Sequence, residues 1–312
     1  MRNPFFMRLL IAIIVVSIGA VPTLAAEKET PPSHLLSRMF VAPTGTTLPT
    51  GFMNLAFGGS FASQGGKEYL GLISIGLGNI AEFEVSTSHI LTNVVNLSEP
   101  IGTTSLKFLL HRTKPGSQMP NIALTLRSNS WSRVQGDEGD LSGPAQPDGG
   151  GGRNVTQVDF DVHETTLFLS ATKEVYPKYI AHGGLIYQEL NIRDISFYPV
   201  NNLTPDSKEW MIGAYFGVEH QVNELTQSIL EVGSKPRIDF DDTLNDLTIS
   251  NLYYLIGGVR FFLNSNASID AAIRYRSDYD GLSDMEIRTG LNIGIDLQKE
   301  IKKKLKRDLA DG

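Results

Sequence analysis

The 312-residue sequence contains no cysteine. This excludes a disulfide framework and an N-terminal cysteine that carries a lipid anchor. Beyond residue 26, no apolar run approaches the roughly 20 residues that a transmembrane helix needs. The chain is also poor in positive charge, with 27 Lys and Arg against 34 Asp and Glu, whereas nucleic-acid partners select basic surfaces. These absences argue against a disulfide-stapled domain, a helical membrane protein and a nucleic-acid-binding protein.

Catalytic and metal-binding motifs are missing as well. Neither Gly-x-Ser-x-Gly nor His-Glu-x-x-His occurs, and none of the 6 histidines clusters with Ser and Asp or Asn at a spacing that strands would bring together. His163, close in sequence to Asp161 and Glu164, comes nearest to a catalytic group, but no positioned partner is evident for it. We therefore predict no catalytic residue, no metal site and no cofactor.

Residues 1–26 have the features of a secretory signal peptide. Arg2 and Arg8 give a positive start, residues 9–21 are apolar or small, and Ala25 and Ala26 offer small-residue cleavage sites. The alternative is an N-terminal membrane helix, but the apolar run is shorter than a bilayer requires. The sequence thus predicts an exported protein.

The chain does contain regular alternation. In three runs near the C-terminus, residues 253–261, 269–276 and 287–297, apolar side chains take every second position. A period of two predicts β-strands. It fits either a soluble sandwich with its apolar face inward or a transmembrane barrel with its apolar face toward lipid and its charges in a lumen. The signal peptide favours the barrel.

The same pattern predicts twelve strands in all. Their approximate ranges are 51–62, 68–77, 81–91, 103–112, 121–133, 157–173, 179–192, 210–221, 227–235, 253–261, 269–276 and 287–297. In the strand at 157–173 the alternation slips near His163, which we interpret as a β-bulge. Every second connection is short, such as 78–80, and the others, apart from the first, are longer, including the glycine-rich stretch 136–153. This rhythm is typical of outer-membrane barrels, and a Greek-key sandwich gives no reason for it.

The predicted fold is therefore all-β: a single transmembrane antiparallel up-and-down β-barrel of about 12 strands over residues 51–297, with both termini periplasmic. Residues 27–50 are a polar periplasmic lead-in with one apolar patch, residues 35–40, that could tuck into the barrel mouth. In the tail, residues 298–312, Ile301, Leu305 and Leu309 recur every four residues among basic ones. This predicts a basic amphipathic helix that lies on the inner leaflet, closes the mouth or is simply solvated.

Alternation also assigns charged side chains to the lumen. The lumen-lining candidates are Glu82, Glu84, Lys107, Arg127, Glu219, Glu231, Arg260, Asp270, Arg274, Arg276, Arg288 and Asp296. Two interpretations stay open. The four arginines among the last three strands could form a basic ladder that selects anionic or sugar-like solutes. Alternatively, charges of both signs pair and brace a closed lumen.

The signal peptide, the alternating strands and the long-loop, short-turn rhythm resemble porin-like Gram-negative outer-membrane β-barrels over nearly the whole chain. The last strand is similar to the C-terminal assembly signal of those proteins, although here the chain continues into a basic tail and does not end on an aromatic residue. The segments Pro43-Thr44-Gly45, Pro49-Thr50-Gly51 and Gly78-Asn79-Ile80-Ala81-Glu82 resemble, more faintly, barrels associated with exopolysaccharide secretion.

Three functions are consistent with such a barrel. The first is a narrow outer-membrane channel or porin for small polar or anionic solutes. The second is an outer-membrane enzyme that acts on lipids, like a phospholipase or lipid A deacylase, and the third is a non-conducting structural barrel that assists polysaccharide export. The expected partners are outer-membrane lipid and lipopolysaccharide, the outer-membrane assembly machinery and a small-molecule solute, with no nucleic acid. Acidic residues of the late loops, such as Asp241 and Asp278, are either solvated or hold divalent cations.

Overall fold

The computed structural model describes residues 36–62, 68–88, 91–92, 101–114, 117–137, 157–198, 206–241, 246–279, 281 and 284–302. They belong to one compact unit, Pro32–Gly312. The predicted signal peptide, most of the glycine-rich stretch and residues 303–312 of the tail lie outside the described residues.

Within the described residues, twelve strands form the wall of a closed β-barrel. They are β1 (Phe52–Ala62), β2 (Glu68–Leu77), β3 (Ala81–Ser88), β5 (Ile101–His111), β6 (Asn121–Asn129), β8 (Gln157–Tyr176), β9 (Tyr179–Tyr198), β10 (Ser207–Asn223), β11 (Thr226–Asp241), β12 (Asp246–Asn264), β13 (Ala267–Arg276) and β14 (Glu286–Asp296). Each overlaps one predicted range, so the prediction of a twelve-stranded all-β barrel is confirmed.

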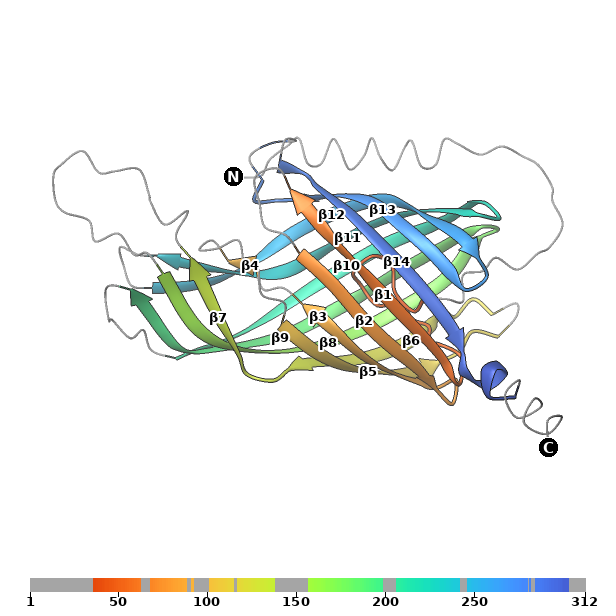
Figure 1. Cartoon of the computed structure of the whole chain (residues 1–312), viewed down its shortest axis with the longest axis horizontal. Helices are drawn as coiled ribbons and strands as arrows, with labels where there is room; N and C mark the ends of the chain where they lie inside the picture. The colour runs from red at the N-terminus through yellow and green to blue at the C-terminus, as the bar shows by residue number, and fades with distance from the viewer. Residues whose placement is uncertain are drawn as a thin grey trace, which may run out of the picture. The chain divides into compact units, whose positions relative to one another are not determined.

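Neighbouring wall strands pair antiparallel, and the first strand pairs with the last. β1 and β14 run in register from Phe52 opposite Asp296 to Ala62 opposite Glu286, which closes the sheet on itself (Figure 1). Closure matters in hydrocarbon, because no water is available there to satisfy the N–H and C=O groups of a free strand edge.

Two shorter strands complete the sheet at the long-loop end. β7 (Ser132–Asp137) continues β6 after a break at Ser130 and Trp131, and both pair with β8. β4 (Leu91–Thr92) pairs parallel with β11, beyond the point where the pairing of β11 with β10 ends. Pro236 of β11 lies in this stretch, as expected where a strand edge loses its neighbour, because proline has no N–H to donate.

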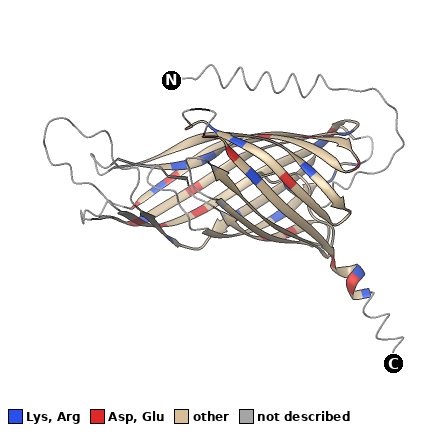
Figure 2. Cartoon of the chain, turned by 45° about the horizontal axis from the view of Figure 1, so that its top comes forward, with Lys and Arg blue, Asp and Glu red and all other residues tan. Residues whose placement is uncertain are grey.

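The outer surface of the wall is apolar and the inner surface is polar. In β10 the side chains of Trp210, Ile212 and Phe216 are exposed, while Tyr215 and Glu219 are buried. Other strands follow the same rule and expose Phe57, Ile73, Phe83, Phe108, Leu126, Leu169, Leu185, Phe261, Ile273 and Ile287. Charged residues of both signs lie along the wall strands (Figure 2). An apolar exterior around a polar interior is the arrangement of outer-membrane β-barrels, whose exterior faces hydrocarbon.

Near the long-loop end, β8 and β9 reverse this rule. Up to residue 188, β9 turns the polar His182 and Gln188 inward and exposes Leu185. Beyond it, Leu190 and Ile192 are the inward residues, with exposed fractions of 0% and 1%. Since apolar side chains turn away from water, the strand must leave the bilayer at this level.

The reversal corrects the bulge that we predicted near His163. Even-numbered residues of β8 face inward on both sides of it, because Val162 and Thr166 are both buried. The register of β8 with β9 shifts two to four residues before His163, between Asp159 and Asp161, opposite a stretch where Asp194 has a φ of 53°. The apolar residues change faces because the medium outside the strand changes, and the strand itself continues without a slip at His163.

Short turns join the strands at the other end. Gly78 and Asn79 have φ values of 65° and 58° in the predicted tight turn between β2 and β3, and Lys178 has a φ of 71° between β8 and β9. After β14, residues 297–302 are helical, which is the described part of the predicted tail helix. Among the described residues, no helix is long and apolar enough to cross a bilayer.

Candidate functional site

A segment that precedes the wall in sequence is buried among its inward-facing side chains. Residues 36–48, here called the lumenal hairpin, fold back on themselves, because Thr44 N–H donates to Ser37 O at 2.9 Å and Met39 N–H donates to Ala42 O at 3.0 Å. Met39 is only 1% exposed. The segment that we expected at the barrel mouth therefore lies within the barrel.

Glu231 of β11 holds the tip of the lumenal hairpin. Its carboxylate accepts hydrogen bonds from the N–H groups of Phe40 at 2.9 Å, Val41 at 3.0 Å and Ala42 at 2.9 Å, and from the Tyr254 hydroxyl at 2.9 Å. Three successive N–H groups around one anion form a nest, and hydrogen bonds to a charged group are stronger than neutral ones. Glu231 is 0% exposed, so its carboxylate depends on these donors in place of water.

A carboxylate and a lysine on neighbouring strands hold the base of the lumenal hairpin. Glu82 of β3 accepts hydrogen bonds from Leu48 N–H at 3.0 Å and from the Ser37 hydroxyl. Lys107 of β5, directly opposite Glu82 in the sheet, donates to Ser37 O at 2.6 Å and to Thr46 O at 3.2 Å. The ammonium and the Glu82 carboxylate are 3.9 Å apart, so the two charges also compensate each other.

Other strands donate hydrogen bonds to carbonyl groups of the hairpin. These bonds are Arg260 to Met39 O at 3.4 Å, Arg288 to Phe40 O at 3.1 Å and Tyr215 to Pro43 O at 2.8 Å. The apolar side chains at the tip belong to a cluster of Met39, Phe40, Ala42, Phe168, Ile186, Tyr215, Ile229, Tyr254, Ile256 and Ala272. Gly217 leaves room for the tip, since a Cβ atom there would lie 2.1 Å from the Met39 sulfur.

Most other lumen-lining candidates form ion pairs with wall residues. The pairs are Arg127 with Glu84 at 3.5 Å, Arg260 with Asp270 at 2.8 Å, Arg274 with Glu286, and Glu219 with His182 at 3.5 Å. Arg276 lies at the long-loop end, where it pairs with Asp278 at 2.7 Å. Three arginines of the predicted ladder are thus bound to carboxylates.

Asp296 differs from the other candidates in its position. It is exposed at the end of β14, and its carboxylate accepts a hydrogen bond from Lys299 N–H at 3.0 Å. It therefore caps the first turn of the following helix, where an acidic side chain is favourable. The alternation predicted a lumenal position because the even-numbered residues of β14 face inward. Asp296 is even-numbered, but the strand ends at this residue.

Sequence reasoning missed several members of this site. Glu286 and His182, the partners of Arg274 and Glu219, were not among the candidates. Arg38 was hidden in the lead-in, where the signal was a single charge within the short apolar patch at residues 35–40.

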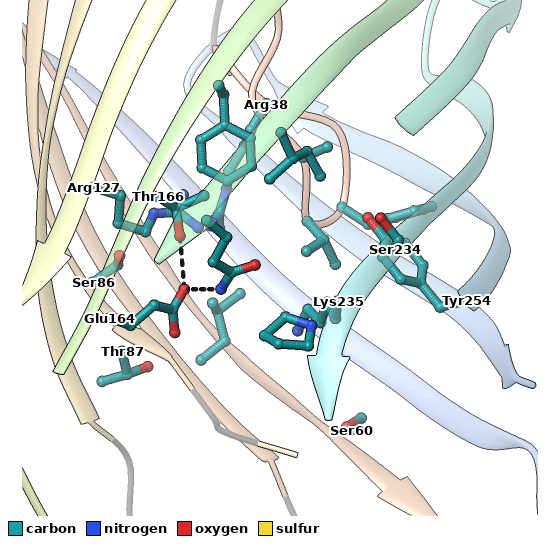
Figure 3. A pocket seen from close by; sticks show the side chains of 18 of the residues that line it. Arg38, Ser60, Ser86, Thr87, Arg127, Glu164, Thr166, Ser234, Lys235 and Tyr254 are labelled. Atoms are coloured by element: carbon teal, nitrogen blue, oxygen red, sulfur yellow. Dashed lines mark hydrogen bonds between the residues drawn. The ribbon is translucent and has the colours of Figure 1, made fainter. Parts of the chain in front are cut away.

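The lumenal hairpin separates two chambers. The loop-side chamber has a volume of about 110 Å³ and is lined by Arg38, Phe40, Val41, Ala42, Gly59, Ser60, Tyr69, Leu70, Ser86, Thr87, Arg127, Glu164, Thr166, Phe168, Ile186, Gln188, Ser234, Lys235, Pro236, Tyr254 and Arg288 (Figure 3). The turn-side chamber has a volume of about 410 Å³ and is lined by Leu36, Ser37, Thr44, Thr46, Thr47, Leu48, Pro49, Leu109, Arg112, Thr113, Asn121, Thr172, Ile180, His182 and Glu219. Residues of the hairpin line both chambers, so the hairpin lies between the two chambers.

On the outer face, the structure joins a serine and a histidine that the sequence did not connect. Ser128 Oγ of β6 lies 3.3 Å from His163 Nε2 of β8, and the Trp131 ring lies beside the imidazole at 5.4 Å between centroids. Within the part of the chain that the structure describes, no side chain bonds the other ring nitrogen of His163. The contact thus places a serine hydroxyl within reach of an imidazole.

Comparison with known proteins gives similarity in fold only. No protein-family model matches the chain, and no curated protein matches it. Among solved structures, the translocator domain of the autotransporter NalP from Neisseria meningitidis is 12% identical, with a TM-score of 0.45 over 79% of this chain and 88% of that one. The KdgM porin in complex with disordered oligogalacturonate is 9% identical, with a TM-score of 0.39 over 77% and 98%. The Ralstonia pickettii toluene transporter TbuX is 9% identical, with a TM-score of 0.36 over 79% and 89%.

Proposed function

We propose that this protein is an outer-membrane channel for small polar or anionic solutes whose closed state is formed by the lumenal hairpin. The observation that carries the proposal is the hairpin between the two chambers. Side chains alone fill the interior of an eight-stranded barrel, whereas a twelve-stranded barrel encloses more space. Here part of that space is occupied by the main chain of the hairpin, whose one β-bridge among the described residues is internal, between Arg38 and Pro43.

The contacts of the hairpin with the wall are of a kind that can break and re-form, so the hairpin could move out of the lumen. Each hydrogen bond to Glu82, Lys107 or Glu231 replaces one to water, so its net contribution is only about 0.5–1.5 kcal/mol, or up to about 3 kcal/mol for a charged group. Burial of Met39 and Phe40 adds about 1.5–3 kcal/mol each. The hairpin is therefore held firmly at rest, but its departure would break no pairing between wall strands.

Conductance across planar lipid bilayers tests this proposal. We expect a low or intermittent current from the intact protein and a steady current from a variant that lacks residues 36–48. Glu231→Gln keeps the shape of the anchor and removes its charge, so it should open more often than the intact protein. Heat-modifiable gel migration verifies that each variant is folded.

Two results would contradict the channel proposal. One is a folded deletion variant that conducts no more than the intact protein. The other is a Glu231→Gln variant with unchanged opening. The first would favour the non-conducting barrel that assists polysaccharide export, and the second would show that the charge of Glu231 does not hold the channel closed.

We further propose that the short turns and both termini are periplasmic, and that the predicted signal peptide and the outer-membrane assembly machinery deliver the chain. The support is the alternation of short and long connections. The chain that follows the hairpin reaches the wall at the short-turn end, where Thr50 N–H donates to Asn79 Oδ1 at 2.6 Å. An epitope inserted at residues 78–80 should then stay hidden from antibody on intact cells, and surface labelling there would reverse the orientation.

The Ser128–His163 contact favours a second candidate function, hydrolysis of outer-membrane lipid. A serine hydroxyl activated by an adjacent imidazole can attack an ester, and this pair faces outward near the level at which β8 and β9 leave the bilayer. Purified protein in mixed phospholipid and lipid A micelles tests it, with Ser128→Ala as the matched variant. Turnover that Ser128→Ala abolishes would establish the enzyme, and the absence of turnover would dismiss it.

A further inference from the structure

The loop-side chamber carries an excess of positive charge. Its described lining includes four cationic side chains, Arg38, Arg127, Lys235 and Arg288, and one carboxylate, Glu164. Because the chamber lies within a protein wall, these charges act through a medium that screens them less than bulk water does. A chamber with this lining attracts an anion.

The one carboxylate of this lining is already engaged. Glu164 Oε1 accepts hydrogen bonds from the Thr166 hydroxyl at 2.9 Å and from Gln188 Nε2 at 2.7 Å (Figure 3). Two uncharged donors therefore satisfy this oxygen of the carboxylate. A ligand anion would therefore not have to compete with the Glu164 carboxylate for an arginine.

Arg38 is the cation most available to a ligand. Within the described residues it makes no hydrogen bond and no ion pair through its side chain, although it lines the chamber. The carboxylates whose charges act on it, Glu84 and Asp270, are each paired with another arginine. Arg127 lies 3.5 Å from Glu84, and Arg260 lies 2.8 Å from Asp270. A guanidinium without a partner is suited to bidentate binding of a carboxylate.

Arg127 adds a second donor beside an aromatic ring. Its Nε atom is buried with no hydrogen-bond partner, and its guanidinium lies 5.2 Å from the centroid of the Phe168 ring. Ile186, Val41 and Leu70 extend the apolar part of the lining. The chamber thus offers cationic donors and an apolar surface side by side.

We infer that the loop-side chamber binds a small organic acid, with its carboxylate at Arg38 and Arg127 and its apolar body against Phe168 and Ile186. This inference rests on the proposed channel function and names the class of solute. An enclosed apolar cavity of about 150 Å³ admits benzene. The loop-side chamber is smaller, at about 110 Å³, but it is only partly enclosed, so it suits a short chain or a single ring that projects from it. The selecting arginine is then on the hairpin, whereas three of the four arginines of the predicted ladder, Arg260, Arg274 and Arg276, are bound to carboxylates.

Calorimetric titration of the intact protein in detergent tests the inference with two probes. Benzoate carries the carboxylate and the ring, and benzamide is its uncharged isostere. We expect benzoate to bind at least about tenfold more tightly than benzamide, because the hydrogen bonds to a charged group are the stronger ones. Inorganic sulfate, which lacks an apolar body, should bind more weakly than benzoate.

Matched variants locate the site. Arg38→Ala should weaken benzoate binding at least about tenfold. Arg38→Lys keeps the charge but not the planar guanidinium that donates two parallel hydrogen bonds, so it should weaken the binding of benzoate less. Arg112→Ala removes a cation from the turn-side chamber and should leave the affinity unchanged. Within the described part of the chain, the Arg38 side chain makes no hydrogen bond that anchors the hairpin, so its replacement should leave the fold intact.

The outcomes separate this inference from the channel proposal. Absent benzoate binding, equal binding of benzoate and benzamide, sulfate that binds as tightly as benzoate, or an Arg38→Ala variant that binds like Arg112→Ala would each overturn the inference. Conductance plays no part in these measurements. A protein that binds benzoate through Arg38 and never conducts would leave the chamber assignment standing and remove the channel.

Discussion

Two stretches of β9 follow opposite rules. From Ala181 to Gln188 the exposed residues are apolar and the buried ones are small or polar, except Ile186, whereas from Glu189 onward Leu190 and Ile192 are buried and polar residues face out. The pleat is the same in both stretches, so alternation alone does not say which face is apolar. The medium outside the wall decides it: hydrocarbon around the first stretch and water around the second.

The reversal on β8 and β9 begins at the level of Trp210 on the neighbouring strand β10. Thr165 of β8 is opposite Glu189 of β9, and Glu189 is opposite Trp210 of β10. Trp210 is an exposed aromatic residue of the kind that marks the membrane–water interface. Just beyond it, Lys208 pairs with Glu189 at 2.9 Å, as surface charges do in water. The row therefore marks the edge of the bilayer.

The largest effect should come from placing an amide in the apolar interior of the second stretch. Leu190→Asn loses about 1.5–3 kcal/mol of apolar burial and leaves a buried amide without partners, so we expect it to cost about 3–5 kcal/mol in total. Lys208→Asn, on the outer face of the same end, should cost less than about 1 kcal/mol. Urea unfolding of the protein in liposomes measures both. If both substitutions lowered the free energy of unfolding equally, the side of the second stretch that carries Leu190 would not be shielded from water.

A smaller effect is expected from a charge on the lipid-facing side of the first stretch. Leu185 is 58% exposed, and Leu185→Arg should cost about 2–4 kcal/mol if the residue lies near the bilayer midplane. Asn191→Arg, six residues farther along the same face, should change the free energy of unfolding by less than about 0.5 kcal/mol because it lies in water. A comparable loss from Asn191→Arg would place the bilayer edge beyond Asn191 and refute the assigned boundary.

Alternation and turn chemistry were enough to predict the wall. A membrane-facing strand must present apolar residues at every second position, and Gly78-Asn79 must turn the chain, so both features are written locally in the sequence. No local sequence pattern marks the edge of the bilayer. Near His163 the change of faces has the same sequence signature as a bulge, and only the level of the strand in the barrel distinguishes the two.

The candidate site was predictable in part for the same reason. Parity placed Glu231 and Lys107 among the lumen-lining candidates, but their partners on the hairpin are 191 and 70 residues away in sequence, counted from Phe40 and Ser37. Ser128 and His163 lie on neighbouring wall strands, β6 and β8, but they are 35 residues apart in sequence because β7 and the glycine-rich stretch intervene. Contacts of this kind depend on closure and register, which no local pattern contains.

The smallest effect is expected at Asp278, in the turn after β13, where the wall meets water. Burial alone would raise the pKa of its carboxyl, but Arg276 and Arg237, each 2.7 Å away, hold that pKa below its usual value. A group whose pKa falls on folding stabilises the folded state above its ordinary pKa of about 3.9 and loses that contribution as the pH drops through the lowered value. Asp278→Asn should therefore cost less than about 1 kcal/mol at pH 7, because the pair is partly exposed, and the same amount at pH 5. Urea unfolding at pH 7, 5 and 3 measures this. The difference from the intact protein should shrink only below about pH 4, and a difference that stays constant at pH 3 would show that Asp278 acts as a neutral hydrogen-bond acceptor instead of a charge.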